Sequence, residues 1–473
     1  MKKIYLYNTL GRQKEEFRSL KKGQVSFYYC GPTVYWTQHI GNLRGAVCAD
    51  LINRSFTYFA YKVKMVRNYT DVGHLVSDED EGSDKMEQGA AREGLSPQAI
   101  ADKYIKIYEA DTAALNIWFP TYAPRATAYI KEDIALVKTL LDKDWAYSTE
   151  LAIYFSVAKF PDYNRLSGQD LDQNREQAGR GEASDPKKKN PADFALWFFK
   201  AGVHKKALQF WASPFYSPLV KDGEGFPGWH IECSAMAKKL LGETIDVHMG
   251  GIEHISVHHT NEIAQSEAAS DVKFVDYWLH NAHLLVDNQK MAKSAGTSYS
   301  LAEVEERGFS PLALRYFFLQ AHYRSNQNFT WEAIKAAATG LENIYKRVRE
   351  LGSKAGRPDK AFQARFWELL ANDFNVPATL ALISEVLKAD LEDKIKLGTL
   401  FDFDRVWGLK LKETAQKKII EAPIPSAVQN LFNDREAARQ AKDFARADKL
   451  RQAIEAQGYK IEDGPEGSRL SPK

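Results

Sequence analysis

The apolar and polar positions near the start of the chain predict a β-α-β unit. Residues 25–29 form a β-branched and aromatic run that is typical of a buried strand. Between residues 43 and 51, leucine and valine recur every four positions, as on one face of a helix. Residues 62–70 predict a second strand. Residues 30–42 are therefore the turn of the unit, where the end of a strand and the first turn of a helix commonly bind ligands.

The rest of the chain continues as mixed α/β and then becomes helical. The acidic run 78–81 has no apolar pattern and predicts a solvated loop. From residue 311 onward the periodicity is helical, with a linker expected at 352–359. The expected elements between and beyond these points are helices at 101–108 and 134–141, strands at 152–157 and 244–249, a helix at 256–269, a helix pair over 362–387 and a terminal helix over 444–454 with Phe444, Ala447, Leu450 and Ile454 on one face.

Composition narrows the class of protein. A chain of 473 residues predicts two to four domains. Three widely spaced cysteines are too few for a disulfide framework, and with no signal peptide or membrane span they indicate a cytoplasmic protein. The net charge is only +2, so a nucleic-acid partner would have to meet local basic patches. The run Lys187, Lys188 and Lys189 predicts a solvated loop, with tRNA contact as the alternative. Basic residues are also dense on one C-terminal helical stretch, though acidic residues dilute them: Arg435, Arg439, Lys442, Arg446, Lys449 and Arg451.

Four residues have the chemistry of a zinc site. Zinc favours thiolate, imidazole and carboxylate ligands in a tetrahedral set. His258 and Glu262 are four residues apart and share one helical face, whereas His259 points about 100° away. Cys30 and Cys233 would complete the set if the fold brings them together. The alternative is a pair of buried thiols and a surface histidine pair.

Two short segments suit phosphate binding. His39, Gly41 and Asn42 lie at a helix start, where free N–H groups and the helix dipole attract anions. Lys290 and Lys293 lie within a polar loop, K-M-A-K-S, and could stabilise a pyrophosphate leaving group. Each segment alone has an ordinary alternative, a capped turn or a solvated loop.

Taken together, these segments resemble the class I aminoacyl-tRNA synthetases, and cysteinyl-tRNA synthetases in particular. The resemblance rests on H-I-G-N at 39–42 (family H-I-G-H), K-M-A-K-S at 290–294 (family K-M-S-K-S), G-W-H-I-E-C at 228–233 and H-H-T-N-E at 258–262. It runs almost end to end. The departures are Asn42, Ala292 and the acidic stretch 72–96.

The resemblance implies a role for each site residue. It implies that Cys30, Cys233, His258 and Glu262 hold one zinc ion, which binds the substrate thiolate and so distinguishes cysteine from serine. It further implies that His39, Gly41, Asn42, Gly250, Gly251, Glu253, Lys290 and Lys293 serve ATP with Mg²⁺, and that Thr70 and Trp229 hold the amino acid; a plain strand-end threonine is the alternative at Thr70.

The implied activity is a ligase reaction: cysteine and ATP form cysteinyl-adenylate, and the cysteinyl group passes to the terminal adenosine of its tRNA. The protein is expected to be monomeric, with no membrane partner. A cysteine–amino sugar ligase and a catalytically silent tRNA-binding paralogue are the alternatives. The expected fold is a Rossmann-like parallel sheet at 1–115 and 206–300, an inserted connective subdomain at 116–205, a stem-contact linker at 301–350, a helical bundle at 351–422 and a small tRNA-contacting tail at 423–473.

Overall fold

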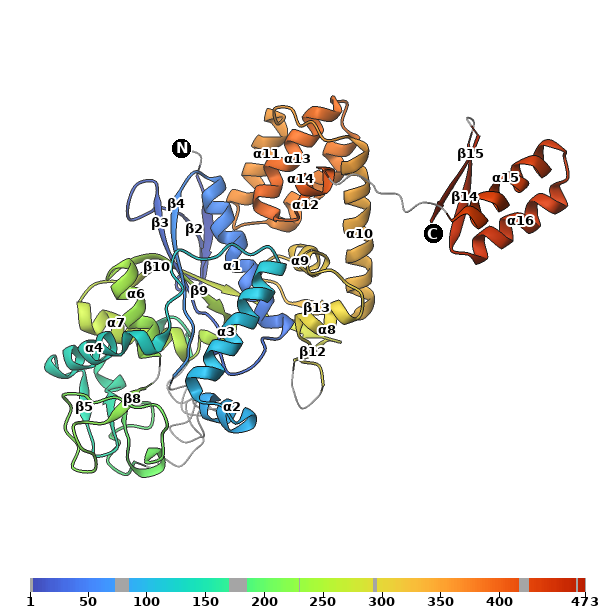
Figure 1. Cartoon of the computed structure of the whole chain (residues 1–473). Helices are drawn as coiled ribbons and strands as arrows, with labels where there is room; N and C mark the ends of the chain where they lie inside the picture. Colours follow the sequence, from blue (N-terminus) through green and yellow to red (C-terminus); the bar gives the residue numbers. More distant parts are fainter. Residues whose placement is uncertain are drawn as a thin grey trace. The chain divides into compact units, whose positions relative to one another are not determined.

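The computed structural model describes residues 3–72, 85–169, 185–228, 230–291, 296–416, 425–464 and 467–472 (Figure 1). The chain divides into two compact units, residues 1–416 and 417–473. The predicted acidic loop 78–81 and the candidate site residues Trp229 and Lys293 lie outside the described residues. Within the described part of the chain, none of the helices combines the length and the apolar character needed to span a membrane.

The core of the first unit is a parallel four-stranded sheet in the order β10-β9-β3-β4. Its strands are β3 (Gln24–Tyr29), β4 (Lys62–Arg67), β9 (Ile245–Gly251) and β10 (Val275–Asn281). The chain moves from β3 to β4 on one side and from β9 to β10 on the other. The strand order therefore reverses between β3 and β9, and ligands bind at the carboxyl ends of the strands beside such a switch point.

Strand β3 is buried on both faces because helices cover both sides of the sheet. Phe27 and Tyr29 pack on the side of α1 (Ile40–Tyr58). Tyr28 points the other way and packs against α6 (Ile231–Leu241), beside which α7 (His258–Ser270) lies. This alternation follows from the two-residue period of a strand and explains why the run 25–29 is continuously apolar. The predicted β-α-β unit is confirmed.

A long insertion separates β4 from β9. It begins with α2 (Lys85–Glu93) and α3 (Pro97–Ala114), after which residues 121–126 run parallel to β4 and exchange backbone hydrogen bonds with it. Next come α4 (Ile130–Asp142) and an antiparallel sheet in the order β5-β6-β7-β8. Its strands are β5 (Ala146–Ser148), β6 (Ala152–Phe155), β7 (Phe194–Phe199) and β8 (Gly225–Pro227). This sheet therefore includes a strand that lies beyond residue 205.

After β10 the chain forms a small sheet and then helices. The sheet has the order β12-β11-β13, with β11 (Leu284–Val286), β12 (Gln289–Lys290) and β13 (Gln327–Phe329). The first unit also contains a hairpin of β1 (Tyr5–Asn8) and β2 (Gln13–Glu16). Its remaining helices are α8 (Leu301–Glu306), α9 (Pro311–Leu319), α10 (Trp331–Glu350), α11 (Lys360–Ala371), α12 (Val376–Lys388), α13 (Asp393–Trp407) and α14 (Leu411–Gln416). The predicted linker 352–359 contains no helix or strand.

The second unit is a helix pair with a hairpin. Its elements are α15 (Ser426–Gln440), α16 (Phe444–Ala456), β14 (Tyr459–Gly464) and β15 (Gly467–Pro472). The terminal helix is confirmed, but the face predicted for it is wrong at its first residue. Ala447 and Ile454 are buried, whereas Phe444 is 63% exposed because it is the first helical residue, beside the turn between the two helices.

The basic residues of this unit do not all face solvent. Arg435 is buried and binds Asp463 at 2.9 Å, and Arg439 binds the same carboxylate at 2.6 Å. Arg451 donates to the carbonyl of Ile461. These three arginines therefore hold the helices against the hairpin.

Candidate active site

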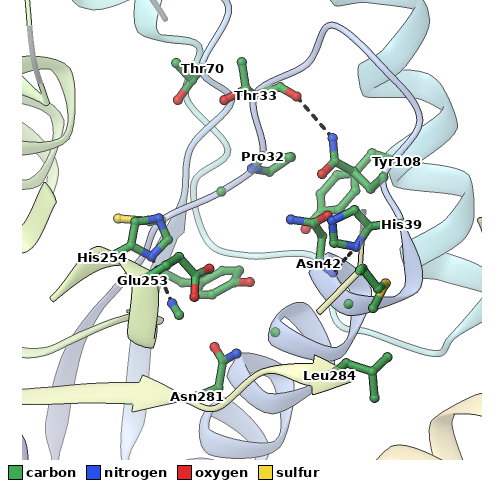
Figure 2. Close-up of a pocket in the computed structure, with 18 of the residues that line it drawn as sticks. Pro32, Thr33, His39, Asn42, Thr70, Tyr108, Glu253, His254, Asn281 and Leu284 are labelled. Atoms are coloured by element: carbon green, nitrogen blue, oxygen red, sulfur yellow. Dashed lines mark hydrogen bonds between the residues drawn. The ribbon is translucent and has the colours of Figure 1, made fainter. Parts of the chain in front are cut away.

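The described site residues meet at one cavity. It has a volume of about 490 Å³ and lies at the carboxyl ends of β3, β9 and β10 (Figure 2). Figure 2 shows His39 and Asn42 on one side of it, Glu253 and His254 across from them, and below them Asn281, which ends β10, and Leu284, which begins the strand Leu284–Val286. The predicted site residues that line it are Cys30, His39, Gly41, Asn42, Thr70, Cys233, Gly251, Glu253, His258 and Lys290.

A tight crossing places Cys30 at the end of β3. Gly31 lies against the backbone that follows β4, and a Cβ added at Gly31 would stand 1.7 Å from the carbonyl oxygen of Asn68. The Gly31 N–H donates to the Asn68 side chain at 2.9 Å, and the same side chain donates to the Thr70 hydroxyl at 3.0 Å. Only glycine fits this crossing, so Cys30 and Thr70 are fixed relative to each other.

Helix α1 begins with a histidine cap. His39 has extended backbone geometry, and its Nδ1 accepts the backbone N–H of Asn42 at 3.2 Å. The N-cap is therefore His39 and not Asn42. This cap takes the N–H of Asn42, and the carbonyl of Tyr299 takes that of Ile40, so in the first turn the N–H of Gly41, which lines the cavity, is the one that can bind an anion.

The two cysteines, which are 203 positions apart in sequence, converge with α7. The ligand atoms of Cys30, Cys233, His258 and Glu262 all lie within 4.8 Å of one another. Cys30 Sγ is 3.6 Å from His258 Nε2 and 3.8 Å from Glu262 Oε1, and those last two atoms are 3.0 Å apart. A tetrahedral zinc ion with bonds of about 2.0–2.3 Å holds its ligand atoms roughly 3.3–3.8 Å apart. The donor set and its spacing fit a metal ion of this kind.

The charges of the cluster suit a cation. Hydrogen bonding to Cys30 lowers the pKa of Cys233 to about 6 against the effect of burial, and His258 adds to this. Burial raises the pKa of Cys30 well above its usual value. Burial alone would raise the pKa of Glu262, but His248 and His258 lower it to about 2. The cluster thus holds one carboxylate and one readily formed thiolate. Against the effect of burial, Cys233 and Glu262 raise the pKa of His258 to about 10, so a bound metal ion would displace a proton from His258 as well as from the second thiol.

A second donor set lies behind the first. Cys30 and Glu262 also come within 4.8 Å of His248 and His259. Neither of these histidines lines the cavity, whereas Cys30, Cys233 and His258 do. A metal ion must be reachable from the cavity to meet a substrate, so the first set is the one that fits a substrate-binding metal.

The two inner histidines support the cluster instead. His248 Nε2 lies 2.9 Å from Glu262 Oε2, which orients the carboxylate so that its other oxygen faces His258. His259 Nδ1 lies 2.7 Å from His280, whose other nitrogen lies 2.8 Å from the Thr9 hydroxyl. Sequence reasoning missed His248 and His280. Their signal was a histidine within each of two buried strands, β9 and β10.

Two residues near the predicted K-M-A-K-S loop contact the start of α1. Met291, within the loop, packs so closely on Gly41 that an added Cβ there would stand 2.6 Å from the Met291 methyl group. Further along the chain, beyond the loop, the carbonyl of Tyr299 accepts the N–H of Ile40 at 2.8 Å. The described part of this segment therefore contacts the H-I-G-N turn.

The remaining predicted residues differ in their access to the cavity. Gly251 and Glu253 line the cavity, and Glu253 is 3.7 Å from His283. Gly250 does not line it: a Cβ there would lie 2.7 Å from His254 and from His259, so this glycine allows histidines to pack behind the strand end.

The fold, with the H-I-G-N turn and Lys290 at one cavity, is that of a class I aminoacyl-tRNA synthetase. The family model of the tRNA synthetases class I (C) catalytic domain matches residues 16–339. A cysteine–tRNA ligase 1 of Burkholderia lata is 43% identical over 469 residues, which cover 99% of this chain and 96% of the relative. A cysteine–tRNA ligase of Thermus thermophilus is 37% identical and covers 98% of both chains. The chain belongs to the cysteine–tRNA ligase family.

Solved structures agree on the fold. The methionyl-tRNA synthetase of Mycobacterium tuberculosis bound by methionyl-adenylate matches with a TM-score of 0.53 at 15% identity, covering 83% of this chain and 92% of that one. The LeuRS of Agrobacterium radiobacter K84 matches with a TM-score of 0.54 at 12% identity, covering 85% and 86%. At these identities the matches show the class I fold alone, and the expected fold class is confirmed.

Proposed function

We propose that this protein is a cysteine–tRNA ligase, which activates L-cysteine with ATP and transfers the cysteinyl group to the 3′ terminal adenosine of its tRNA. One observation supports this most strongly. The thiol, imidazole and carboxylate cluster opens into the same cavity as the H-I-G-N turn and Lys290. A metal-ligating set is therefore within reach of a phosphate-binding helix start, which is what selective activation of a thiol-bearing amino acid requires.

Selection of cysteine is assigned to Cys30, Cys233, His258 and Glu262, with one zinc ion per chain. Cysteine and serine differ by a single atom, and pocket shape separates substrates that differ by a methylene by only ~10–200-fold. Zinc bound there would supply a soft Lewis acid that prefers the substrate thiolate to a hydroxyl. The Thr70 hydroxyl accepts from Asn68, so its own proton can be donated to the substrate carboxylate. Trp229 is expected to complete the amino-acid pocket.

ATP, with Mg²⁺, is assigned to the other side of the cavity. The start of α1 would receive the α-phosphate through the N–H of Gly41, the side chains of His39 and Asn42 and the positive end of the helix dipole. Lys290, together with Lys293, would stabilise the charge that develops on pyrophosphate as it leaves. The carboxylate of Glu253, at the end of β9, can accept hydrogen bonds from the ribose hydroxyls.

The second unit is assigned to the tRNA. Lys442, Arg446 and Lys449 are exposed, unlike Arg435, which is buried by its contacts with the hairpin. Phe444, 63% exposed, lies among these three cations. Exposed aromatic rings beside cationic side chains suit stacking on unpaired bases next to phosphates.

The test is cysteine-dependent exchange of pyrophosphate into ATP, followed by charging of purified tRNA. Exchange should require cysteine and fail with serine, and elemental analysis should give about one zinc per chain. Cys233→Ser should abolish cysteine-dependent exchange and zinc binding. Cys48→Ser changes a buried thiol of α1, away from the cluster, and should leave exchange and zinc binding intact. A protein that selects cysteine fully without metal, or that shows no cysteine-dependent exchange, would contradict the proposal.

A further inference from the structure

A buried arginine lies at the junction of the two phosphate-binding segments. Arg44, in the second turn of α1, is fully buried. Among the described residues its guanidinium has only neutral acceptors: the carbonyls of Ala282 at 2.5 Å, Ser325 at 2.8 Å and His322 at 3.3 Å, and the side-chain oxygen of Gln327 at 3.1 Å. Burying a cation without a carboxylate is costly unless each donor is satisfied, so this geometry is specified closely.

The four acceptors belong to the scaffold of the phosphate loop. Ala282 lies between β10 and β11, and Gln327 begins β13, which pairs with β11. Strand β11 in turn pairs with β12 and places Lys290 opposite Leu285. The position of Lys290 therefore depends on how β11 is held, and Arg44 holds both the chain that enters β11 and the strand beside it.

Helix α1 carries the other phosphate-binding residues. Arg44 follows Asn42 by two positions and lies one turn beyond the H-I-G-N start. The contact of Met291 with Gly41 shows how closely the two segments meet at the cavity. A shift of β11 relative to α1 would therefore move Lys290 and disturb the contact between Met291 and Gly41.

We infer that Arg44 is a positioning residue for adenylate formation: it fixes the β11–β12 hairpin, and with it Lys290, relative to the first turn of α1. It lines no part of the cavity and touches no substrate. The inference rests on the proposed function, because the step it affects is attack on ATP. A misplacement of about 1 Å far from the reacting atoms can cost ~10²-fold in rate.

Lysine at this position would keep the positive charge but lose the planar set of N–H donors that the guanidinium provides. A guanidinium offers five donors in a fixed plane, whereas an ammonium offers three on a shorter, mobile stem, so it cannot serve acceptors on both sides at once. Arg44→Lys should therefore loosen the hairpin without removing the cation. We expect a fall of ~10²-fold in kcat/KM for ATP in pyrophosphate exchange.

Arg315→Lys is the matched control. Arg315 is also fully buried, on α9, and donates to the carbonyls of Trp407 at 2.6 Å and Leu115 at 3.0 Å as well as to Asp50. Its partners do not include β11 or β13. The two variants should lose similar thermal stability, but only Arg44→Lys should lose exchange. Zinc content should be normal in both, and transfer from preformed cysteinyl-adenylate to tRNA should change by less than about threefold.

The outcomes separate this inference from the proposed function. Wild-type protein without cysteine-dependent exchange would refute the proposed function and the inference with it. Active wild type with normal exchange in Arg44→Lys, or equal loss of exchange in both variants, would refute the inference alone. If Arg44→Lys fails to fold, Gln327→Met removes one acceptor and leaves Arg44 in place. It should lower exchange more than transfer, and equal loss of both steps would refute the inference.

Discussion

Gly31→Ala adds only one methyl group, but we expect it to displace the turn that holds Cys30 in the candidate site. A Cβ at residue 31 would stand 1.7 Å from the carbonyl oxygen and 2.8 Å from the carbonyl carbon of Asn68. Both atoms belong to the backbone that leaves β4, so no side chain can rotate out of the way. The alanine can be accommodated only if the turn after Cys30 moves away from β4.

We expect Gly31→Ala to lower both the stability of the fold and the affinity of the proposed metal site. Extra methyl groups in a packed core typically cost ~1–3 kcal/mol, which for a unit of 416 residues predicts a fall in Tm of roughly 1–4 °C. Cys30 adjoins residue 31, and its Sγ lies within 4.8 Å of the ligand atoms of Cys233, His258 and Glu262 in the proposed metal site. We expect metal affinity to fall by ~10–100-fold, the range seen when the support of a ligand is lost.

Three measurements check this prediction: Tm, zinc content after dialysis, and kcat/KM for cysteine in pyrophosphate exchange. Gly340→Ala in α10 is the control, since its Cβ would lie 3.4 Å from the Tyr316 ring and alanine favours a helix by about 1 kcal/mol. That variant should equal or exceed wild type in Tm and keep its zinc. Wild-type Tm, zinc and activity in Gly31→Ala would refute the reasoning about this crossing.

Three further predictions concern other parts of the molecule. Lys293→Ala should slow adenylate formation by ~10²–10³-fold and spare transfer to tRNA in pre-steady-state assays, because pyrophosphate has already left; failure mainly in transfer would contradict its role. Ending the chain at Gln416 should spare exchange and depress tRNA charging, because residues 417–473 form a separate unit; equal loss of both would mean that this unit supports the catalytic fold. Burial and Glu305 raise the pKa of Asp111 to about 6, so its contribution to stability is present below pH 3.8 and lost as the pH rises through 6. Asp111→Asn should therefore raise the free energy of unfolding by about 1 kcal/mol at pH 8, allowing for its partial exposure, and by nothing at pH 4; an equal gain at both pH values in urea titrations would contradict this.

The amino-acid sequence determined the features that depend on near neighbours in the chain. The run 25–29, the four-residue spacing of α1 and the second strand predicted the β-α-β unit correctly, because strand and helix periods are local. The spacing of His258 and Glu262 also predicted that they share a helical face, and their ligand atoms are 3.0 Å apart.

Only the tertiary structure decided which distant groups meet. Cys30 and Cys233 come together because the strand order reverses between β3 and β9, and α6 then runs beside that switch point. Nothing in the local pattern specifies this order. The same holds for the choice between two overlapping ligand sets: His259 stands next to His258 in sequence, yet its hydrogen bond to His280 on β10 holds it behind the cluster.

Charge patterns were the least reliable guide, for a physical reason. Six basic residues lie between 435 and 451, diluted by acidic ones, and the sequence does not tell that Arg435 and Arg439 meet Asp463 from the hairpin that follows. Arg44 shows the converse, since its position in a helix gives no sign that it joins two segments nearly 250 residues apart. A charged side chain is long enough to reach several elements, and only the packing of those elements decides whether it meets solvent, a carboxylate or a ring of carbonyls.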